Sequence, residues 1–421
     1  MSSQFQWDLL QLTRRLWVRA TAFSVLAVAT ALVAILVKRY IPPDIPTKIG
    51  ADAVDNLLNI IAASMLSVTI FSLSTLVAAL ASATNSVTPR ATRLLSEDTT
   101  AQNALAIFVG TFLYSLVGII ALQTGLYGST GRVVLYVVTL VVIAIMVATL
   151  LRWIHHVVKI GRVGTTTERV EEVTERAMRH RHKTPYLGGH PHTEVDALPE
   201  GCTPVHSGRM GYVEHIDMGA LERACGSEAH RIYVEALPGA FVDTDRPLAR
   251  VFGPCDDDMR TAVREAFAVA DTRSFDQDPR FGVTVMAEIA SRALSPAVND
   301  AGTAIDVLGR AARVLSLWAD PIPPDAVEVE YPRIHVPPVD IGDLFNDIFI
   351  PIARDGAGTV EVGVRLQKTL RTLSRMGGPN YREAALRHSA MALERAEKAL
   401  TLEDDLRRVR EIASDLRSDR G

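Results

Sequence analysis

Polar residues that could bind a ligand are concentrated in two strings in the second half of the chain. One string runs from Arg273 to Gly282, and the other runs from Arg292 to Asp300. Guanidinium, carboxylate and amide groups around a helix–turn–helix can hold a small polar ligand, and they can equally form a hydrogen-bonded corner or a subunit contact. The sequence leaves these interpretations open. The residues that could form such a ligand or assembly site are Arg273, Asp276, Gln277, Asp278, Arg292, Asn299 and Asp300.

A second group of polar side chains lies in residues 56–89, an uncharged stretch rich in Ser, Thr and Asn. As a helix this stretch would be about 50 Å long, whereas the hydrocarbon core of a bilayer is about 30 Å thick. At roughly 100° per residue, its hydroxyl and amide side chains fall on one face. That face is typical both of close helix packing and of a hydrated path. The residues that could line a pore or cavity are Asn56, Ser64, Ser67, Ser74, Thr75, Ser82 and Asn85.

The opposite face of the same stretch is apolar, and we expect it to contact lipid. It carries Leu58, Met65, Leu66, Leu73, Leu76 and Leu80.

The chain lacks the usual signatures of enzymes. No Lys lies between Lys183 and Lys368, and no Gly-x-Gly-x-x-Gly or Gly-x-Ser-x-Gly pattern occurs. The run Asp256–Asp258 precedes a helical pattern, where carboxylates complement the helix dipole. The histidines and the cysteine between residues 180 and 206 fit no usual zinc spacing, so we interpret that region as a solvated linker. We therefore expect no catalytic residue, no metal and no cofactor.

These polar groups must be positioned by two different kinds of structure, of which the first is a membrane bundle. Four uncharged segments are each long enough to cross a bilayer. The first is not a cleaved signal peptide, because no small-residue cleavage site precedes a soluble mature chain. In the third, Thr111, Ser115 and Gly118 form a face typical of helix packing. We predict a four-helix transmembrane domain over residues 1–160, with spans at about 16–38, 57–84, 103–126 and 133–155.

The distribution of charge predicts the orientation of the bundle. Lys and Arg are concentrated near the amino terminus, in the second-to-third connection and after the fourth span, so both termini are expected in the cytoplasm. The first outer loop, residues 41–46, contains three prolines and is expected to be stiff and extended. The net charge is −4 overall and −8 over residues 156–421, which argues against nucleic-acid binding. All three cysteines lie in the expected cytoplasmic part, where thiols stay reduced.

The second kind of structure is a cytoplasmic α/β domain. Strands are predicted at 211–216, 231–236, 240–242 and 248–252, and helices at 259–270, 281–293 and 301–317. Residues 238–248 look like half of a biotinyl- or lipoyl-carrier barrel, but the attachment lysine is missing, so a small barrel there would be structural. Residues 327–336 suggest a last hairpin or edge strand. The predicted order is a juxtamembrane helix (161–183), a linker (184–200), the cytoplasmic α/β domain with a β-barrel-like unit plus helices (201–338), and a C-terminal helical region (339–421).

Four parts of the chain resemble a known family. They are residues 64–90 with their Asn85-Ser86-Val87-Thr88-Pro89-Arg90 ending, residues 108–114, residues 275–282, and residues 292–300. The chain resembles the family of predicted bacterial membrane proteins called domain of unknown function 2254. Where the family usually continues Asn-Asp-Pro, this chain has Ala301, which could loosen the start of the next helix. The resemblance implies a bacterial inner-membrane protein with four spans, and it implies no activity.

Two functions from different classes follow. The first is a homo-oligomeric passive channel or transport pathway, lined by the second transmembrane helix and modulated by the cytoplasmic domain. A pump is disfavoured because the uncharged spans contain no Asp, Glu or Lys for coupling. The second is a membrane-anchored sensor or scaffold that binds a ligand or protein partner through the cytoplasmic domain. The expected partners are the lipid bilayer and further copies of the chain, while the ion or small ligand is unknown.

Overall fold

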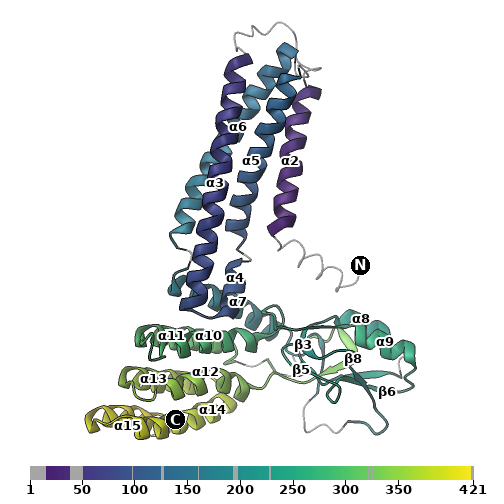
Figure 1. The fold of residues 1–421 in the computed structure, drawn as a ribbon. Helices are drawn as coiled ribbons and strands as arrows, with labels where there is room; N and C mark the ends of the chain where they lie inside the picture. Colours follow the sequence, from purple (N-terminus) through teal and green to yellow (C-terminus); the bar gives the residue numbers. More distant parts are fainter. Residues whose placement is uncertain are drawn as a thin grey trace. The chain divides into compact units, whose positions relative to one another are not determined.

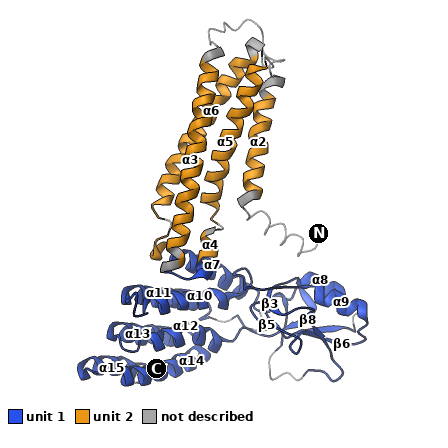
Figure 2. Ribbon diagram, viewed as in Figure 1, with its two compact units in different colours: residues 1–6, 86–91, 166–421 blue, residues 7–85, 92–165 orange. Residues whose placement is uncertain are grey.

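The chain forms two compact units, shown in different colours in Figure 2. The computed structural model describes residues 16–37, 51–96, 98–124, 128–159, 161–192, 198–226, 229–320, 322–323 and 327–418. Unit 1 comprises the described residues of Ser86–Ala91 and Thr166–Gly421, and unit 2 comprises those of Trp7–Asn85 and Thr92–Thr165. The boundary expected at residues 338 and 339 therefore falls inside unit 1. The stiff loop expected at residues 41–46 lies outside the described residues.

Unit 2 is a bundle of long helices (Figure 1). These are α2 (Leu16–Val37), α3 (Ala51–Ser86), α5 (Thr99–Gln123) and α6 (Gly128–Val157), while the short helix α4 (Pro89–Ser96) crosses the boundary with unit 1. Three helices in the described part of the chain are long and apolar enough to cross a membrane, at Ala53–Ser82, Thr99–Gln123 and Gly131–Val157. The apolar part of α2, Val18–Val33, is shorter. The first of the four predicted spans therefore stays a prediction.

Small residues allow the helices of unit 2 to pack closely. A Cβ atom on Gly118 would lie 3.1 Å from Cδ1 of Leu58, and the neighbouring Ser115 is completely buried. The Tyr114 hydroxyl meets the Thr139 hydroxyl at 3.0 Å inside the bundle. The sequence-based prediction that this part of α5 is a packing face is therefore confirmed.

Two β-sheets occupy the first half of unit 1. The larger has the strand order β1 (Gly189–Pro191), β8 (Tyr331–Val336), β4 (Arg231–Val234), β6 (Pro247–Phe252), β2 (Thr203–His206). The smaller has the order β5 (Phe241–Val242), β3 (Gly211–Ile216), β7 (Phe267–Ala270). Helices α8 (Met218–Ala224) and α9 (Asp257–Glu265) are capped by the side chains of Asp217 and Asp256. Neither sheet closes into a barrel among the described residues, so the predicted barrel-like unit is not confirmed.

Three sequence-based assignments in this region are wrong. Strand β1 lies within the stretch assigned as a linker, and β7 replaces the second half of the helix predicted at 259–270. Strand β8 is neither a hairpin nor an edge, because it pairs in parallel with β1 on one side and β4 on the other. These strands are short, and their pairing partners are distant in sequence, so local periodicity carries little sign of them.

Six helices form the second half of unit 1. They are α10 (Pro279–Ala293), α11 (Ala301–Ser316), α12 (Ile341–Asp355), α13 (Val360–Met376), α14 (Pro379–Ala399) and α15 (Glu403–Ser418). Figure 1 shows them as stacked pairs, α10 with α11, α12 with α13, and α14 with α15. Helices α10 and α11 match the helices predicted at 281–293 and 301–317, and α12 to α15 lie in the predicted C-terminal helical region. Helix α11 starts at Ala301 with Asp300 as its N-cap, so the missing proline does not prevent the expected helix start.

Helix α10 also packs on α7 (Val163–Lys183) with very little space between them. A Cβ atom on Gly282 would lie 2.0 Å from Oγ1 of Thr174 and 2.7 Å from its Cβ. Thr174 is completely buried, and its hydroxyl donates to the Val170 carbonyl at 2.6 Å, so it has little freedom to move. This contact requires glycine at position 282.

We predict that Gly282→Ala destabilises unit 1 by about 1–3 kcal/mol, because the added methyl group overpacks the α7–α10 contact. Thermal and denaturant unfolding of the purified full-length protein would measure the effect. Gly363→Ala is the matched control, since its nearest neighbour would be 3.4 Å away and alanine favours a helix. Equal effects of the two substitutions would contradict the close packing described here.

The buried His388 makes the stability of the folded protein depend on pH. His388 on α14 is 2% exposed and lies beside Phe345 and Phe349. Burial, together with the neighbouring Arg387 and Arg395, lowers the pKa of His388 from 6.5 to about 4. Between these values the unfolded chain binds a proton that the folded chain does not, so stability rises with pH there and falls as the pH drops from 6.5 towards 4.

We expect the buried neutral His388 to lower the free energy of unfolding by up to about 3 kcal/mol as the pH falls from 6.5 towards 4. His388→Gln should reduce the pH dependence of the unfolding free energy. His180→Gln changes an exposed histidine and should leave that dependence as in the wild type. Thermal unfolding of the three proteins as a function of pH measures the difference. An unchanged acid slope in His388→Gln would show that another group is responsible.

Candidate functional site

Unit 1 contains a cavity of about 460 Å³ lined by charged residues. Segments that are distant in sequence contribute to its wall, and four of them are central to the site. They are the end of α7 with Arg181, the turn after β4 with Gly239, the start of α10 with Asp278, and the start of α12 with Asp343. The cavity lies within one unit, and its volume is in the range of small-molecule sites.

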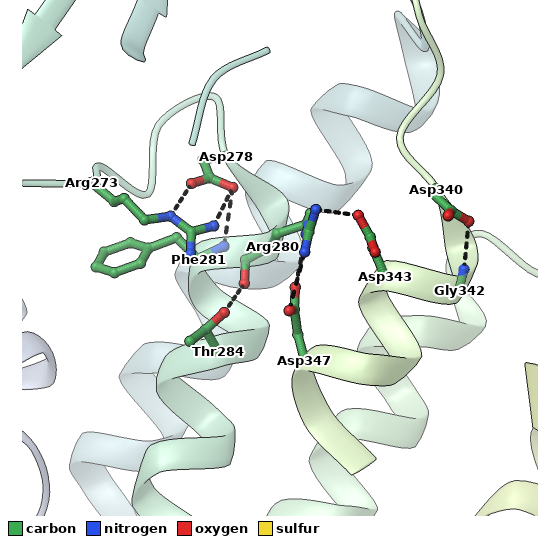
Figure 3. A network of polar contacts seen from close by, with 9 residues as sticks. All are labelled: Arg273, Asp278, Arg280, Phe281, Thr284, Asp340, Gly342, Asp343 and Asp347. Carbon is green, nitrogen blue, oxygen red and sulfur yellow. Dashed lines mark hydrogen bonds and ion pairs between the residues drawn. The ribbon is translucent and has the colours of Figure 1, made fainter. Parts of the chain in front are cut away.

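The centre of the wall is an ion pair between Arg273 and Asp278 (Figure 3). Nε of Arg273 donates to Oδ2 of Asp278 at 2.7 Å, and Nη2 donates to Oδ1 at 3.1 Å. Oδ1 also accepts the backbone N–H of Phe281 at 3.1 Å, so Asp278 is the N-cap of α10. Asp278 is 2% exposed, and burial raises the pKa of its carboxyl while Arg273 opposes that rise. Each carboxylate oxygen thus accepts at least one hydrogen bond within the chain.

Gly239 allows the turn after β4 to approach this ion pair. Its φ is +92°, and a Cβ atom at this position would lie 2.2 Å from Oδ2 of Asp278. Its backbone N–H donates to the Val213 carbonyl at 2.8 Å, which holds the turn against the smaller sheet. A side chain at position 239 would therefore collide with the buried carboxylate.

Arg280 connects α10 to α12 beside the cavity (Figure 3). Its Nε donates to Oδ2 of Asp347 at 2.8 Å, its Nη2 donates to Oδ1 at 3.2 Å, and its Nη1 pairs with Asp343. Asp340 accepts the backbone N–H of Gly342 at 2.7 Å and caps α12. These contacts hold the starts of two helices at the cavity wall.

Arg181 is the unusual member of the wall. It is 3% exposed, and its Nε and Nη1 are buried without a hydrogen-bond partner. Burial lowers the pKa of Arg181 to about 10, and the nearby Asp278 opposes that shift. A buried guanidinium normally has its N–H groups satisfied, so this arrangement is suited to accepting a ligand with oxygen acceptors.

The seven residues proposed from sequence for this site fall in two places. Arg273, Gln277 and Asp278 line the cavity, and Oε1 of Gln277 accepts the backbone N–H of Ile216 at 3.1 Å. Asp276 lies beside them and accepts from the Ser274 hydroxyl at 3.3 Å. The remaining three lie at the other end of α10, because most of this fifteen-residue helix lies between the two strings. They are Arg292, at the end of α10, and Asn299 and Asp300, which precede α11.

The second string has a structural role at two of its positions. Asp300 accepts the backbone N–H of Thr303 at 3.0 Å and its hydroxyl at 2.6 Å, and it caps α11. Asn299 adopts a φ of +52°, a conformation that asparagine tolerates better than most residues.

A separate contact on α10 involves the segment that follows α3 in the chain. The Glu288 carboxylate accepts the Thr88 hydroxyl at 2.8 Å and pairs with Nη1 of Arg90 at 2.5 Å. Thr88 and the adjacent Val87 are buried. We call this contact the Glu288 clasp. It accounts for the Val87-Thr88-Pro89-Arg90 part of the family-like string.

The polar face of α3 is turned outward in unit 2. Asn56, Ser64, Ser67, Ser74 and Ser82 are exposed, Thr75 is half-buried, and the side chain of Asn85 lies outside the described residues. The hydroxyls of Ser67 and Thr75 donate to backbone carbonyls one turn earlier, at 3.1 and 2.9 Å. These hydroxyl donors are therefore satisfied within the helix itself.

The expectation that the leucine face of α3 contacts lipid is wrong for three of its six residues. Leu58, Met65 and Leu76 are buried against the other helices of unit 2. Leu66 and Leu73 are exposed, each at 47%. The physical reason is that the large apolar side chains fill the bundle interior, while hydroxyls with partners in their own helix tolerate the outside.

Sequence reasoning missed several residues of the site. Arg181 lies in a basic run at the end of α7, and nothing in its spacing distinguishes it from the exposed Arg179. Asp343 and Asp347 look like ordinary first-turn and surface acids of α12. Gly239 lies in the stretch that looks like half of a carrier barrel, and no role at the site is predicted for it. Their roles depend on contacts between segments far apart in the chain.

Comparisons with known proteins identify relatives but no activity. The family model described as "Predicted membrane protein (DUF2254)" matches residues 13–372. Uncharacterized proteins of Mycobacterium bovis and Mycobacterium tuberculosis are each 26% identical over 268 residues, which are 61% of this chain and 50% of theirs. The chain thus spans about half the length of these curated relatives. No solved structure matches the chain significantly.

Proposed function

This chain belongs to the DUF2254 family of predicted membrane proteins, and on that premise we propose that it is a membrane-anchored sensor. In this proposal unit 2 holds the protein in the bilayer, and the cavity of unit 1 binds a small polar ligand. The protein lies in the bacterial inner membrane with four spans and both termini in the cytoplasm, and it acts as a homo-oligomer. The distribution of Lys and Arg along the sequence supports this orientation.

The observation that supports the proposal is that Arg181 is buried without hydrogen-bond partners for two of its nitrogens. A side chain that is 3% exposed carries two buried nitrogens without a partner, and it borders a cavity large enough for a small molecule. Leaving a charged donor buried and unsatisfied is costly for stability. A ligand in the cavity would offset that cost, and ligand binding is therefore the role that this arrangement favours.

Helix α10 offers a route by which binding could be sensed. Its first residues line the cavity, and Glu288 near its other end holds Thr88 and Arg90 in the clasp. The clasped segment follows directly on α3 in the chain. A ligand that shifts α10 would change the clasp, so the occupied and empty states would differ at residues 86–91.

We predict that one chemical class in a panel of small polar metabolites raises the Tm of the full-length protein in lipid nanodiscs. The panel should contain organic acids, phosphorylated compounds, amino acids, polyamines and neutral sugars. The stabilising compound should also change hydrogen exchange at residues 86–91, and Glu288→Gln should weaken that change without abolishing binding. Thermal unfolding and hydrogen-exchange mass spectrometry provide the two measurements.

Glu172→Gln is the matched control, because it removes a carboxylate that pairs with Arg169 on the surface of α7. It should leave both responses unchanged. The sensor proposal fails if no compound in the panel stabilises the protein, or if a stabilising compound leaves residues 86–91 unaffected.

The outward polar face of α3 favours a second candidate function, a homo-oligomeric passive channel or transport pathway. Most of its hydroxyl and amide side chains are exposed in the described part of unit 2. Further copies of the chain could cover this face and line a path with it, modulated by the cytoplasmic unit. The hydrogen bonds of Ser67 and Thr75 to their own helix show that these two hydroxyl donors do not require such a path.

If α3 lines a path, Ser67→Asp and Ser74→Asp should increase cation flux relative to anion flux in liposomes, because acidic side chains at a pore attract cations. Thr149→Asp on α6 is the control, since its hydroxyl also donates to a carbonyl one turn earlier but lies outside the α3 face. Absence of flux from the reconstituted wild type over a range of ions, voltages and membrane tensions would exclude the pathway.

A further inference from the structure

We infer that the cavity beside Arg181 binds a small anion through a phosphate or carboxylate group. This inference rests on the proposed function, because it names the ligand class of the same cavity. The cavity is larger than a bare inorganic ion requires, so the group would belong to a small molecule.

The first step concerns the free-energy cost of keeping the charged Arg181 side chain buried beside the cavity. Its guanidinium cannot lose its proton at neutral pH, so the charge stays even where it is poorly solvated. The Asp278 carboxylate reduces this cost from nearby, but its two oxygens are engaged by Arg273 and by the Phe281 backbone N–H. The unsatisfied N–H groups of Arg181 therefore need acceptors from elsewhere.

The second step is the balance of charge along the wall. Each carboxylate that lines the cavity has a partner in the chain. Glu235 pairs with Arg250, Asp278 with Arg273, Asp343 with Arg280, and Asp340 accepts the Gly342 backbone N–H. Among the described residues, no ion pair engages the guanidinium of Arg181 or that of the exposed Arg246, which also lines the cavity. Within the described part of the chain, the charges of the wall without an ion-pair partner are those of Arg181, Arg246 and Asp340, which leaves one positive charge in excess.

The third step is that two helices have their N-terminal ends at the cavity. The first residues of α10 and of α12 both belong to the wall. A helix N-terminus carries partial positive charge and favours an anion. A cation would meet three carboxylates already in ion pairs, and also Arg181 and Arg246, which form no ion pair among the described residues, so an anionic group is the better match. Phosphate and carboxylate share the oxygen acceptors that guanidinium prefers.

The inference is tested on the full-length protein in nanodiscs with two probes, inorganic phosphate and citrate, at constant pH and ionic strength. The Tm of the wild type should rise with probe concentration and reach a plateau. Arg181→Met should remove this response, and Arg179→Met should keep it, because Arg179 is exposed two residues earlier on α7. A general stabilising effect of the salts would raise the Tm of all three proteins equally.

The ligand-free proteins provide a further readout. Replacing a buried guanidinium that lacks partners by an apolar side chain should leave the Tm unchanged or raise it, whereas loss of a purely structural arginine would lower it. Arg181→Lys covers the case in which Arg181→Met does not fold. It keeps the charge but loses the planar donor fork, and we expect about tenfold weaker probe binding.

The outcomes separate this inference from the sensor proposal. A response to phosphate alone or citrate alone supports the inference and identifies the group that is bound. Equal responses of wild type and Arg181→Met, or unchanged probe affinity in Arg181→Lys, would overturn it. If only a neutral or cationic metabolite stabilises the protein, the anion assignment fails and the sensor proposal stands. If nothing in the metabolite panel stabilises it, both fail.

Discussion

The arrangement of unit 1 depends on one buried carboxylate, that of Asp278. A charge that is 2% exposed must be paired and hydrogen-bonded, and Arg273 and the Phe281 backbone N–H meet that requirement. The same carboxylate begins α10 and leaves room only for a glycine at position 239. Removal of either charged partner would leave the other one buried alone. One interaction therefore joins the turn after β4 to the first helix of the stack.

Helix α10, which begins at that interaction, also contacts several other parts of the unit. Arg280 holds α12 at its beginning, and Gly282 permits close contact with α7. Glu288, two turns further on, holds the segment that follows α3. A helix is rigid over this length, so a displacement at its start is carried to its end. The cavity, the stack and the clasp therefore all contact a single element, α10.

Unit 2 depends on a different constraint, which is close packing. Its helices are apolar, and side chains must fill the space between them. Leu58, Met65 and Leu76 of α3 fill it, and the hydroxyl face of α3 is left outside. Helical phasing separates a hydroxyl face from an apolar face, because the period of a helix depends only on local geometry. It assigned the apolar face to lipid, and for those three residues that was wrong. Phasing alone does not say which face meets the neighbouring helices.

The sequence by itself determined most of the helices of both units and the polar string at the start of α10, because these follow from local propensity and spacing. It also placed Arg273, Gln277 and Asp278 among the candidates. Only the tertiary structure decided that β8 is internal, that Arg292 lies far from Asp278, and that Arg181 is buried beside a cavity. Strand partners and burial depend on contacts between distant segments, and neither propensity nor periodicity encodes those contacts.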